Sequence, residues 1–192
     1  MAYRQRDYPD VAYPSRAYPD ATVATSGCGP TCVSILLGNL LGVELPPPEA
    51  AAYALRCGAR VDGGTDMGLL SANLMRDYGL TRVRTDSAEE LLRALKAGHM
   101  AIVNVGGDRA GRAGVLSAGG HYLVAVGAFE RTVLLLDPGI YPGKYAGQYR
   151  GSRVGLCGEL VCVDRDVLAG DCQNRSPAYT IFGRRDGTPP VA

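Results

Sequence analysis

A cysteine between two glycines stands directly before a stretch with the apolar spacing of a buried helix. Residues 26–31 read SGCGPT, and the cysteine is Cys28. A thiol at a helix N-terminus lies beside unpaired N–H groups and the positive end of the helix dipole, which favours the nucleophilic thiolate. The alternative is a small buried side chain that happens to begin a helix, because cysteine is often buried. This motif alone supports both interpretations equally.

A histidine behind two glycines could serve such a thiolate. An imidazole must hold the proton of the thiol and pass it to the leaving group, and the chain has only two histidines. His121 opens an apolar run, which predicts an accessible position at the start of a strand. His99 follows Gly98 at a predicted helix end, where an imidazole has an ordinary structural role. The sequence therefore favours His121 as the general base, with a merely structural His121 as the alternative.

An aspartate at the end of a predicted strand completes the set of candidate residues. Residues 135–139 read LLDPG, with Asp137 at the centre. A carboxylate on a strand next to that of His121 could accept the Nδ1–H of the imidazole and hold the ring in place. Asp-Pro-Gly is also a strong turn sequence, so the motif alone indicates only a turn. In company with Cys28 and His121, Asp137 is predicted to orient the imidazole.

The spacing of apolar residues predicts the elements that position these residues: it is helical in the first half of the chain and typical of strands in the second half. Helices closed by glycines are predicted at residues 31–41, 49–57, 67–78 and 87–97. Short runs rich in β-branched and aromatic residues predict strands at 100–105, 121–129, 132–136, 159–163 and 179–182. Helices first and antiparallel strands afterwards predict an α+β fold rather than a doubly wound one. The glycine-rich residues 106–120 are expected to form a loop at the cleft mouth, where Arg109 and Arg112 either meet an acidic substrate or, as we favour, are solvated.

The first 20 residues differ from the rest in carrying a repeated Tyr-Pro unit. Tyrosines at positions 8, 13 and 18 are each followed by proline, which fixes φ and extends the preceding residue. We expect residues 1–20 to form an extended arm that packs its tyrosines on the domain, with a docking or autoinhibitory role as the alternative. Residues 21–192 are expected to form one catalytic domain, which their length allows.

Composition and charge exclude several classes of partner. The 20 Lys and Arg balance 19 Asp and Glu without a run of one sign, which disfavours nucleic acid. No apolar stretch approaches the roughly 20 residues of a membrane span, and no secretory signal opens the chain, so we expect a cytoplasmic protein or one secreted by another route. The six cysteines lack the paired spacing of a zinc site, and most are expected to be buried free thiols. Nothing in the sequence predicts an oligomeric state.

Taken in this order, the motifs resemble those of the bacteriocin-leader-processing (double-glycine) peptidases and their stand-alone relatives in the papain superfamily. The resemblance covers about residues 22–145 and rests on SGCGPT, DGGT at 62–65, YGL at 78–80, GHY at 120–122 and DPG at 137–139. It implies a papain-like α+β fold, with a cleft between a helical layer and an antiparallel sheet. It also implies the roles of nucleophile for Cys28, base and acid for His121, and orienting group for Asp137. We expect a peptide or protein substrate, and a reaction of this kind requires no cofactor and no metal.

One position departs from the family pattern. Many members place a glutamine about six residues before the cysteine as the second oxyanion donor, whereas this chain has Thr22 there. The nearest upstream glutamine, Gln5, is too far away in the sequence to be assigned, so Thr22, Ser26 or a backbone N–H is expected to replace it. The expected function is peptide bond hydrolysis through a thioester. The alternatives are a catalytically silent peptide-binding module, or acyl transfer or deamidation by the same dyad.

Overall fold

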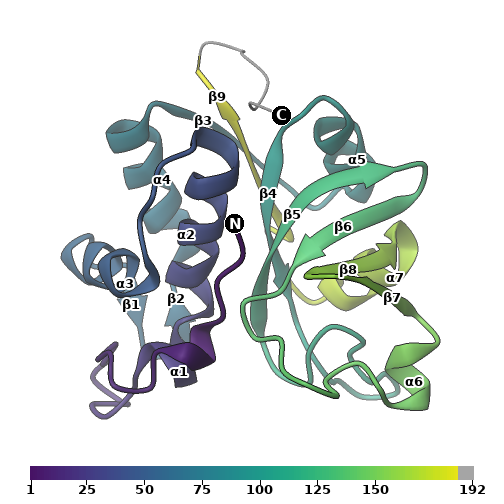
Figure 1. Ribbon diagram of the computed structural model, residues 1–192, viewed down its shortest axis with the longest axis horizontal. Coiled ribbons are helices and arrows are strands. Elements are labelled where there is room, and N and C mark those ends of the chain that lie inside the picture. The colour runs from purple at the N-terminus through teal and green to yellow at the C-terminus, as the bar shows by residue number, and fades with distance from the viewer. Residues whose placement is uncertain (186–192) are drawn as a thin grey trace.

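An antiparallel sheet of seven strands forms the centre of the fold in the computed structural model, which describes residues 1–185 (Figure 1). The strands of this sheet are β3 (Leu80–Thr85), β4 (Met100–Val105), β5 (His121–Phe129), β6 (Thr132–Leu136), β7 (Val154–Cys157), β8 (Leu160–Asp164) and β9 (Tyr179–Arg184). They lie in the order β3-β9-β4-β5-β6-β8-β7, and every pair of neighbours is antiparallel. The last residues of the predicted domain, 186–192, lie outside the described part of the chain.

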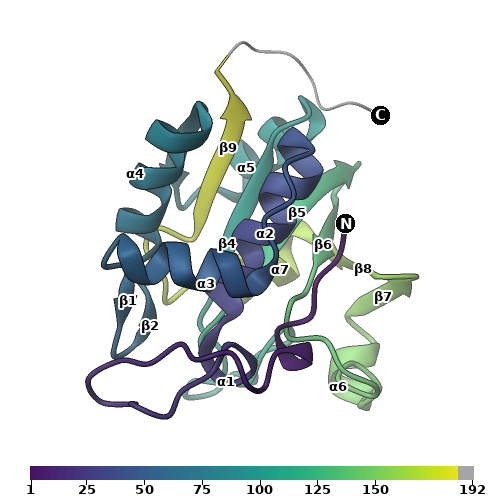
Figure 2. The same cartoon turned by 60° about the vertical axis from the view of Figure 1, so that its left-hand side comes forward.

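Helices cover both faces of this sheet (Figures 1 and 2). One face carries α2 (Cys28–Leu41), α3 (Pro47–Arg56) and α4 (Met67–Tyr78), and the other carries α5 (Ala88–Lys96) and α7 (Arg165–Cys172). The short elements are a 3-10 helix (Gln5–Asp7), α1 (Val23–Ser26), α6 (Gln148–Gly151) and a hairpin of β1 (Arg60–Val61) and β2 (Gly64–Thr65). None of the helices in the described residues is both long and apolar enough to cross a bilayer.

The central strand β4 shows why the sheet is buried on both sides. Ile102 packs in the cluster that holds α2, whereas its neighbours Ala101 and Val103 pack in the cluster that holds α5 and α7. Successive side chains of a strand point to opposite faces, so a strand covered on both faces reads as a continuous apolar run. The predicted bounds of β4, β5 and β6 are confirmed.

Local capping fixes the ends of the helices that carry the site. Gly42 and Gly79 follow α2 and α4 with φ of 70° and 64°, left-handed values that favour glycine. The Asp66 carboxylate accepts the N–H of Leu69 and caps the start of α4. These predicted ends are confirmed, but α2 begins at Cys28, three residues before the predicted helix.

The first residues of the chain pack against the helical half and touch the sheet. Tyr13 has 0% exposure, and its hydroxyl lies 2.9 Å from the Thr65 hydroxyl oxygen. The N–H of Gln5 donates to the Pro138 carbonyl at 2.8 Å, so the start of the chain reaches the turn that follows β6. This segment is not extended throughout, because it contains the 3-10 helix at Gln5–Asp7.

All six cysteines are free thiols. Cys32 and Cys172 are buried, Cys157 is exposed, and the other three are partly exposed. The expectation that most of them would be buried is therefore wrong. The reason for Cys157 is its place on β7, an edge strand with three exposed residues.

Candidate active site

Three elements bring Cys28, His121 and Asp137 to one end of the sheet. Cys28 is the first residue of α2, and His121 is the first residue of β5. Asp137 directly follows β6, which pairs antiparallel with β5. The start of one antiparallel strand lies beside the end of its partner, so His121 and Asp137 are neighbours.

The imidazole of His121 lies between the carboxylate and the sulfur. Its Nε2 lies 2.8 Å from Asp137 Oδ1, not in the Nδ1 contact that the sequence suggested. The ring is also within hydrogen-bonding reach of the Cys28 sulfur. Because Asp137 occupies Nε2, Nδ1 is the ring nitrogen left to exchange a proton with Cys28.

Two glycines of the sequence motifs leave space that side chains would fill. A Cβ on Gly139 would lie 2.9 Å from His121 Cε1, and a Cβ on Gly29 would lie 2.5 Å from Thr65 Oγ1. Real Cβ atoms do not approach other atoms so closely, so either substitution would displace the imidazole or the start of α2. The glycines of DPG and SGCGPT are thus needed for packing of the site itself.

Asp137 is held by four hydrogen-bond donors. Its side chain has 0% exposure, and Oδ1 accepts the N–H of Gly139 at 2.8 Å as well as the His121 ring. Oδ2 accepts from Lys144 Nζ at 2.5 Å and from the Tyr145 hydroxyl at 2.6 Å. Burial alone would raise the pKa of Asp137, but the hydrogen bond and charge of His121 and the Lys144 ammonium hold this pKa well below its usual range. Asp137 is therefore an anion.

Sequence reasoning missed Lys144 and Tyr145. Both are buried, although a lysine in a loop is ordinarily exposed. Their only visible signal was the spacing of seven and eight residues after Asp137 within one loop. That signal is weak, because any loop lysine would show it.

The titration of Cys28 and His121 is governed by their mutual contact. Burial raises the pKa of the Cys28 thiol, but the hydrogen bond and charge of His121, with the N–H groups of Tyr122 and Gly29, outweigh burial and lower it. Burial lowers the pKa of His121, but Asp137 and Cys28 raise it to about 9. Between these two pKa values the pair is a thiolate and an imidazolium.

We therefore expect Cys28 to react with iodoacetamide with a midpoint below pH 8.5, the approximate pKa of an unperturbed cysteine. Mass spectrometry of the peptide that contains Cys28 measures the rate, with exposed Cys157 as an internal reference. In His121→Ala the midpoint should rise above that of the wild-type protein, because the hydrogen bond and charge that contribute most against burial of the sulfur are removed. An unchanged midpoint in this variant would contradict the ion pair.

The candidate oxyanion donors differ in their position relative to the site. The N–H of Thr22 donates to Thr25 Oγ1 at 3.0 Å as part of the start of α1, and Ser26 ends that helix. Within residues 1–185, neither side chain has a hydrogen bond to Cys28 or His121. The Gln5 side chain, in contrast, is 8% exposed and lines the same cavity, of about 240 Å³, as His121 and Gly139.

The distance of Gln5 from Cys28 in the sequence argued against this residue, but the fold brings it close to the site. The 3-10 helix places it against α1, where its Nε2 donates to the Ala24 carbonyl at 3.0 Å. An amide nitrogen carries two hydrogens, so one of them stays free for another acceptor. No spacing rule could have found this glutamine, because the intervening residues loop away and return.

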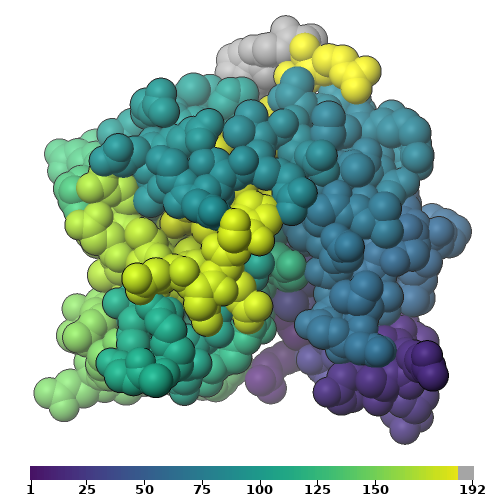
Figure 3. All heavy atoms as spheres, turned by 180° about the vertical axis from the view of Figure 1, so that it is seen from behind, coloured from purple at the N-terminus to yellow at the C-terminus, as the bar shows by residue number. Residues whose placement is uncertain are grey.

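One cavity lies at His121 and a second lies at its neighbour Tyr122. The first is lined by His121 and Gly139, together with Gln5. The second, of about 170 Å³, is lined by Thr65 and Tyr122, whose hydroxyl donates to the Thr65 carbonyl at 3.1 Å. In the view from behind, the lower edge of the molecule is notched between the N-terminal segments and the sheet half (Figure 3).

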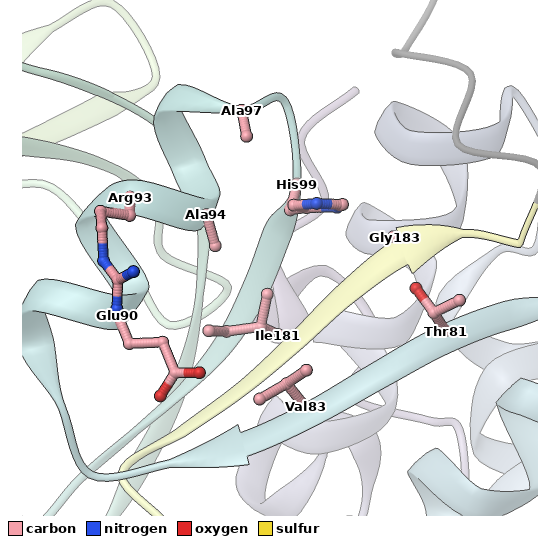
Figure 4. A pocket seen from close by; sticks show the side chains of 9 residues that line it. All are labelled: Thr81, Val83, Glu90, Arg93, Ala94, Ala97, His99, Ile181 and Gly183. Carbon is pink, nitrogen blue, oxygen red and sulfur yellow. The ribbon is translucent and has the colours of Figure 1, made fainter.

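His99 lies elsewhere. It lines a separate cavity of about 350 Å³ between α5 and the strands β3 and β9, where Gly183 leaves room for its ring (Figure 4). His99 precedes β4, whereas His121 pairs with Val105 at the other end of that strand. At 3.3 Å per residue the two histidines are about 20 Å apart along the sheet. The preference for His121 over His99 is thus consistent with the placement of both rings.

Comparison with known proteins identifies the fold. No family model matches the sequence, and no curated protein sequence matches it. A structure from Bacillus anthracis described as a C39-like peptidase is 13% identical with a TM-score of 0.60, covering 96% of this chain and 94% of that chain. The peptidase domain of ComA from Streptococcus, a bifunctional ABC transporter involved in quorum sensing, is 14% identical with a TM-score of 0.53, covering 83% of this chain and 93% of that chain. The chain therefore has the papain-like α+β fold of the C39-like peptidases, the fold that its motifs predicted.

Proposed function

We propose that this protein is a cysteine peptidase that hydrolyses peptide bonds with Cys28, His121 and Asp137. The observation that carries the proposal is the continuous contact from the Cys28 sulfur through the His121 ring to buried Asp137, beside the cavity that His121 lines. The likeness in fold to C39-like peptidases supports the reaction class. A buried structural cysteine would need no imidazole beside it.

The arrangement supports a two-step reaction. The Cys28 thiolate attacks the carbonyl carbon of the scissile bond, and His121 donates its Nδ1 proton to the nitrogen as the C–N bond breaks. The acyl group then remains on sulfur as a thioester. His121 next takes a proton from water, the resulting hydroxide attacks the thioester, and the C–S bond breaks to restore the thiolate. Asp137 holds the ring through Nε2 and stabilises its cationic form throughout.

The tetrahedral oxyanion is assigned to two donors, one at the start of α2 and one on the N-terminal 3-10 helix. Cys28 is the first residue of the helix, and the first N–H groups of a helix have no partner within it. The second donor is the free hydrogen of Gln5 Nε2, in place of the predicted Thr22 or Ser26. Such donors act because they point at the developing charge before the reaction begins.

Gln5→Ala is therefore expected to lower kcat by roughly 100-fold, with a small change in KM, because this donor contacts the oxyanion and not the planar carbonyl. Thr22→Val and Ser26→Ala serve as matched controls that remove the other two candidate donors. Steady-state kinetics of all three variants decide between them. A 100-fold loss in Thr22→Val or Ser26→Ala, with Gln5→Ala unaffected, would reassign the donor.

Product analysis tests the reaction class. The protein is incubated with a mixture of peptides in water labelled with a heavy oxygen isotope, and the products are identified by mass spectrometry. Hydrolysis gives two fragments, with the label in the new carboxylate. Transfer gives a new amide without label, deamidation leaves the peptide intact with a labelled carboxylate, and a silent binding module gives no product. Only labelled fragments support the proposal.

A further inference from the structure

The geometry of the dyad distinguishes the two sides of the cleft. In the proposed reaction the leaving nitrogen receives its proton from His121, so the substrate residues that follow the scissile bond must lie on the imidazole side. The cavity of about 240 Å³ on that side contains His121, whereas the cavity that contains Tyr122 does not. The cavity beside His121 is therefore the site for the leaving part of the substrate.

This cavity is cationic. Its lining includes Arg6, Lys144 and Arg150, and no Asp or Glu of the described residues lines it. Lys144 is neutralised by the buried carboxylate of Asp137 behind it. Arg6 and Arg150 form no ion pair within residues 1–185, which leaves two guanidinium charges facing the cavity. Burial is the main cause that lowers the pKa of the Lys144 ammonium, Asp137 opposes it, and the charges of Arg150 and Arg6 lower this pKa further, so both charges act on this part of the cavity.

The guanidinium of Arg6 is held in place. It lies 4.7 Å from the centre of the Tyr141 ring, and Tyr141 also lines the cavity. A cation over an aromatic face is attracted to the ring and keeps its N–H donors for another partner. Arg6 is thus positioned without its charge being neutralised.

The two arginines of the glycine-rich loop are already paired. Arg109 donates to the Gly170 carbonyl at 2.7 Å, and Arg112 forms an ion pair with Asp171 at 3.4 Å. The sequence predicted these two to be solvated charges or contacts for an acidic substrate, whereas in the structure they hold α7. In the cavity beside His121, the open positive charge lies at Arg6 and Arg150.

We propose that the cavity beside His121 binds an acidic side chain of the substrate, at one of the first residues after the scissile bond, through Arg6 and Arg150. This inference rests on the proposed function, because the hydrolytic reaction defines that side. The chemistry is the recognition of a carboxylate by guanidinium groups, which suit its planar geometry. The substrate class is then a peptide with Asp or Glu at one of the first two residues after the cleaved bond.

Binding of a leaving-group analogue tests the inference without relying on cleavage. The wild-type protein is titrated by NMR, at low salt, with Glu-Ala-Ala-amide and with Gln-Ala-Ala-amide, whose free amines imitate the leaving nitrogen. The Glu peptide should bind roughly tenfold more tightly, since two partly exposed pairs each contribute modestly. This preference should disappear in Arg6→Ala/Arg150→Ala and persist in Arg93→Ala, a control for an exposed arginine on α5. Equal binding of both peptides to the wild-type protein overturns the inference, as does a preference that survives the double variant.

Cleavage of a peptide library separates this inference from the proposed function. New N-termini released by the wild-type protein should be enriched in Asp or Glu within the first two residues, and the double variant should lose this enrichment. Cleavage without such enrichment overturns the inference and leaves the peptidase intact. Absence of cleavage overturns the peptidase, and the titration alone then decides whether the cavity binds an acidic side chain.

Discussion

Replacing Cys28 with alanine is expected to abolish peptide hydrolysis, with a fall in kcat on the order of 10⁴-fold or more. The sulfur is the atom that bonds to the substrate carbonyl in the proposed reaction, and the remaining oxyanion donors cannot substitute for a covalent nucleophile. Because Cys28 is partly exposed and stands at the start of α2, its loss leaves little cavity, and the variant should fold. Kinetics measured on the folded variant, checked by circular dichroism, give the result.

Cys157→Ala is the matched control for this prediction. Cys157 is an exposed free thiol on the edge strand β7, so its removal should leave kcat unchanged. Cys28→Ser extends the test, since a hydroxyl keeps the shape but has no accessible anion near neutral pH. Hydrolysis that persists in Cys28→Ala, with products unchanged, would show that another group attacks the substrate.

The elements that the sequence predicted well have a strong apolar periodicity and are bounded by residues that commonly end helices and strands. Strands β4, β5 and β6 are mainly apolar runs, β4 is followed by Gly106 and β6 by Asp137, and the predicted bounds of all three match the structure. The edge strand β3, in contrast, reads LTRVRT, and its two adjacent pairs of polar residues break both the apolar run and the alternation that would indicate a strand. An edge strand has one paired side and an exposed surface, so tertiary pairing with β9, not local pattern, defines it.

The residues of the candidate site also fall into two groups, those that a local sequence signal predicts and those that it does not. Cys28, His121 and Asp137 could be named because each sits at a strong local signal: a glycine-flanked cysteine before a helix, a strand start and a turn. Gln5 and Lys144 have no local signal. Gln5 reaches the site only because the first residues return to pack on α1 and Pro138, and Lys144 becomes buried only because its loop folds back over Asp137. Contacts of this kind depend on the path of irregular segments, which periodicity does not describe.

The buried group of charges around Asp137 gives the second large expected effect. Asp137→Ala removes the acceptor of the His121 ring and leaves the Lys144 ammonium, with a 6% exposed side chain, without its carboxylate. Breaking a buried pair by removing one partner costs about 3–5 kcal/mol, because the remaining charge stays desolvated. We therefore expect a loss of that order in the free energy of unfolding, measured by urea denaturation, together with a large fall in kcat.

A second variant separates stability from catalysis. Asp137→Ala/Lys144→Met removes the carboxylate and the stranded ammonium together, so it should recover much of the lost free energy of unfolding. It should not recover kcat, because His121 still lacks an acceptor at Nε2. The single variant Lys144→Met provides the matched control, since it keeps Asp137 on the ring.

The pH dependence distinguishes a positioning role for Asp137 from a purely structural one. Its hydrogen bond and charge help to raise the pKa of His121 to about 9, so without Asp137 this pKa must fall. The imidazolium is the acid that protonates the leaving amine, so the alkaline limb of kcat/KM, near pH 9 in the wild type, should move to lower pH in the double variant. In Lys144→Met the alkaline limb of kcat/KM should stay near the pH of the wild type, because Asp137 still accepts from Nε2. If the double variant regained both the wild-type stability and the wild-type pH profile, Asp137 would serve only to hold Lys144, and the imidazole would be oriented by packing against Gly139 alone.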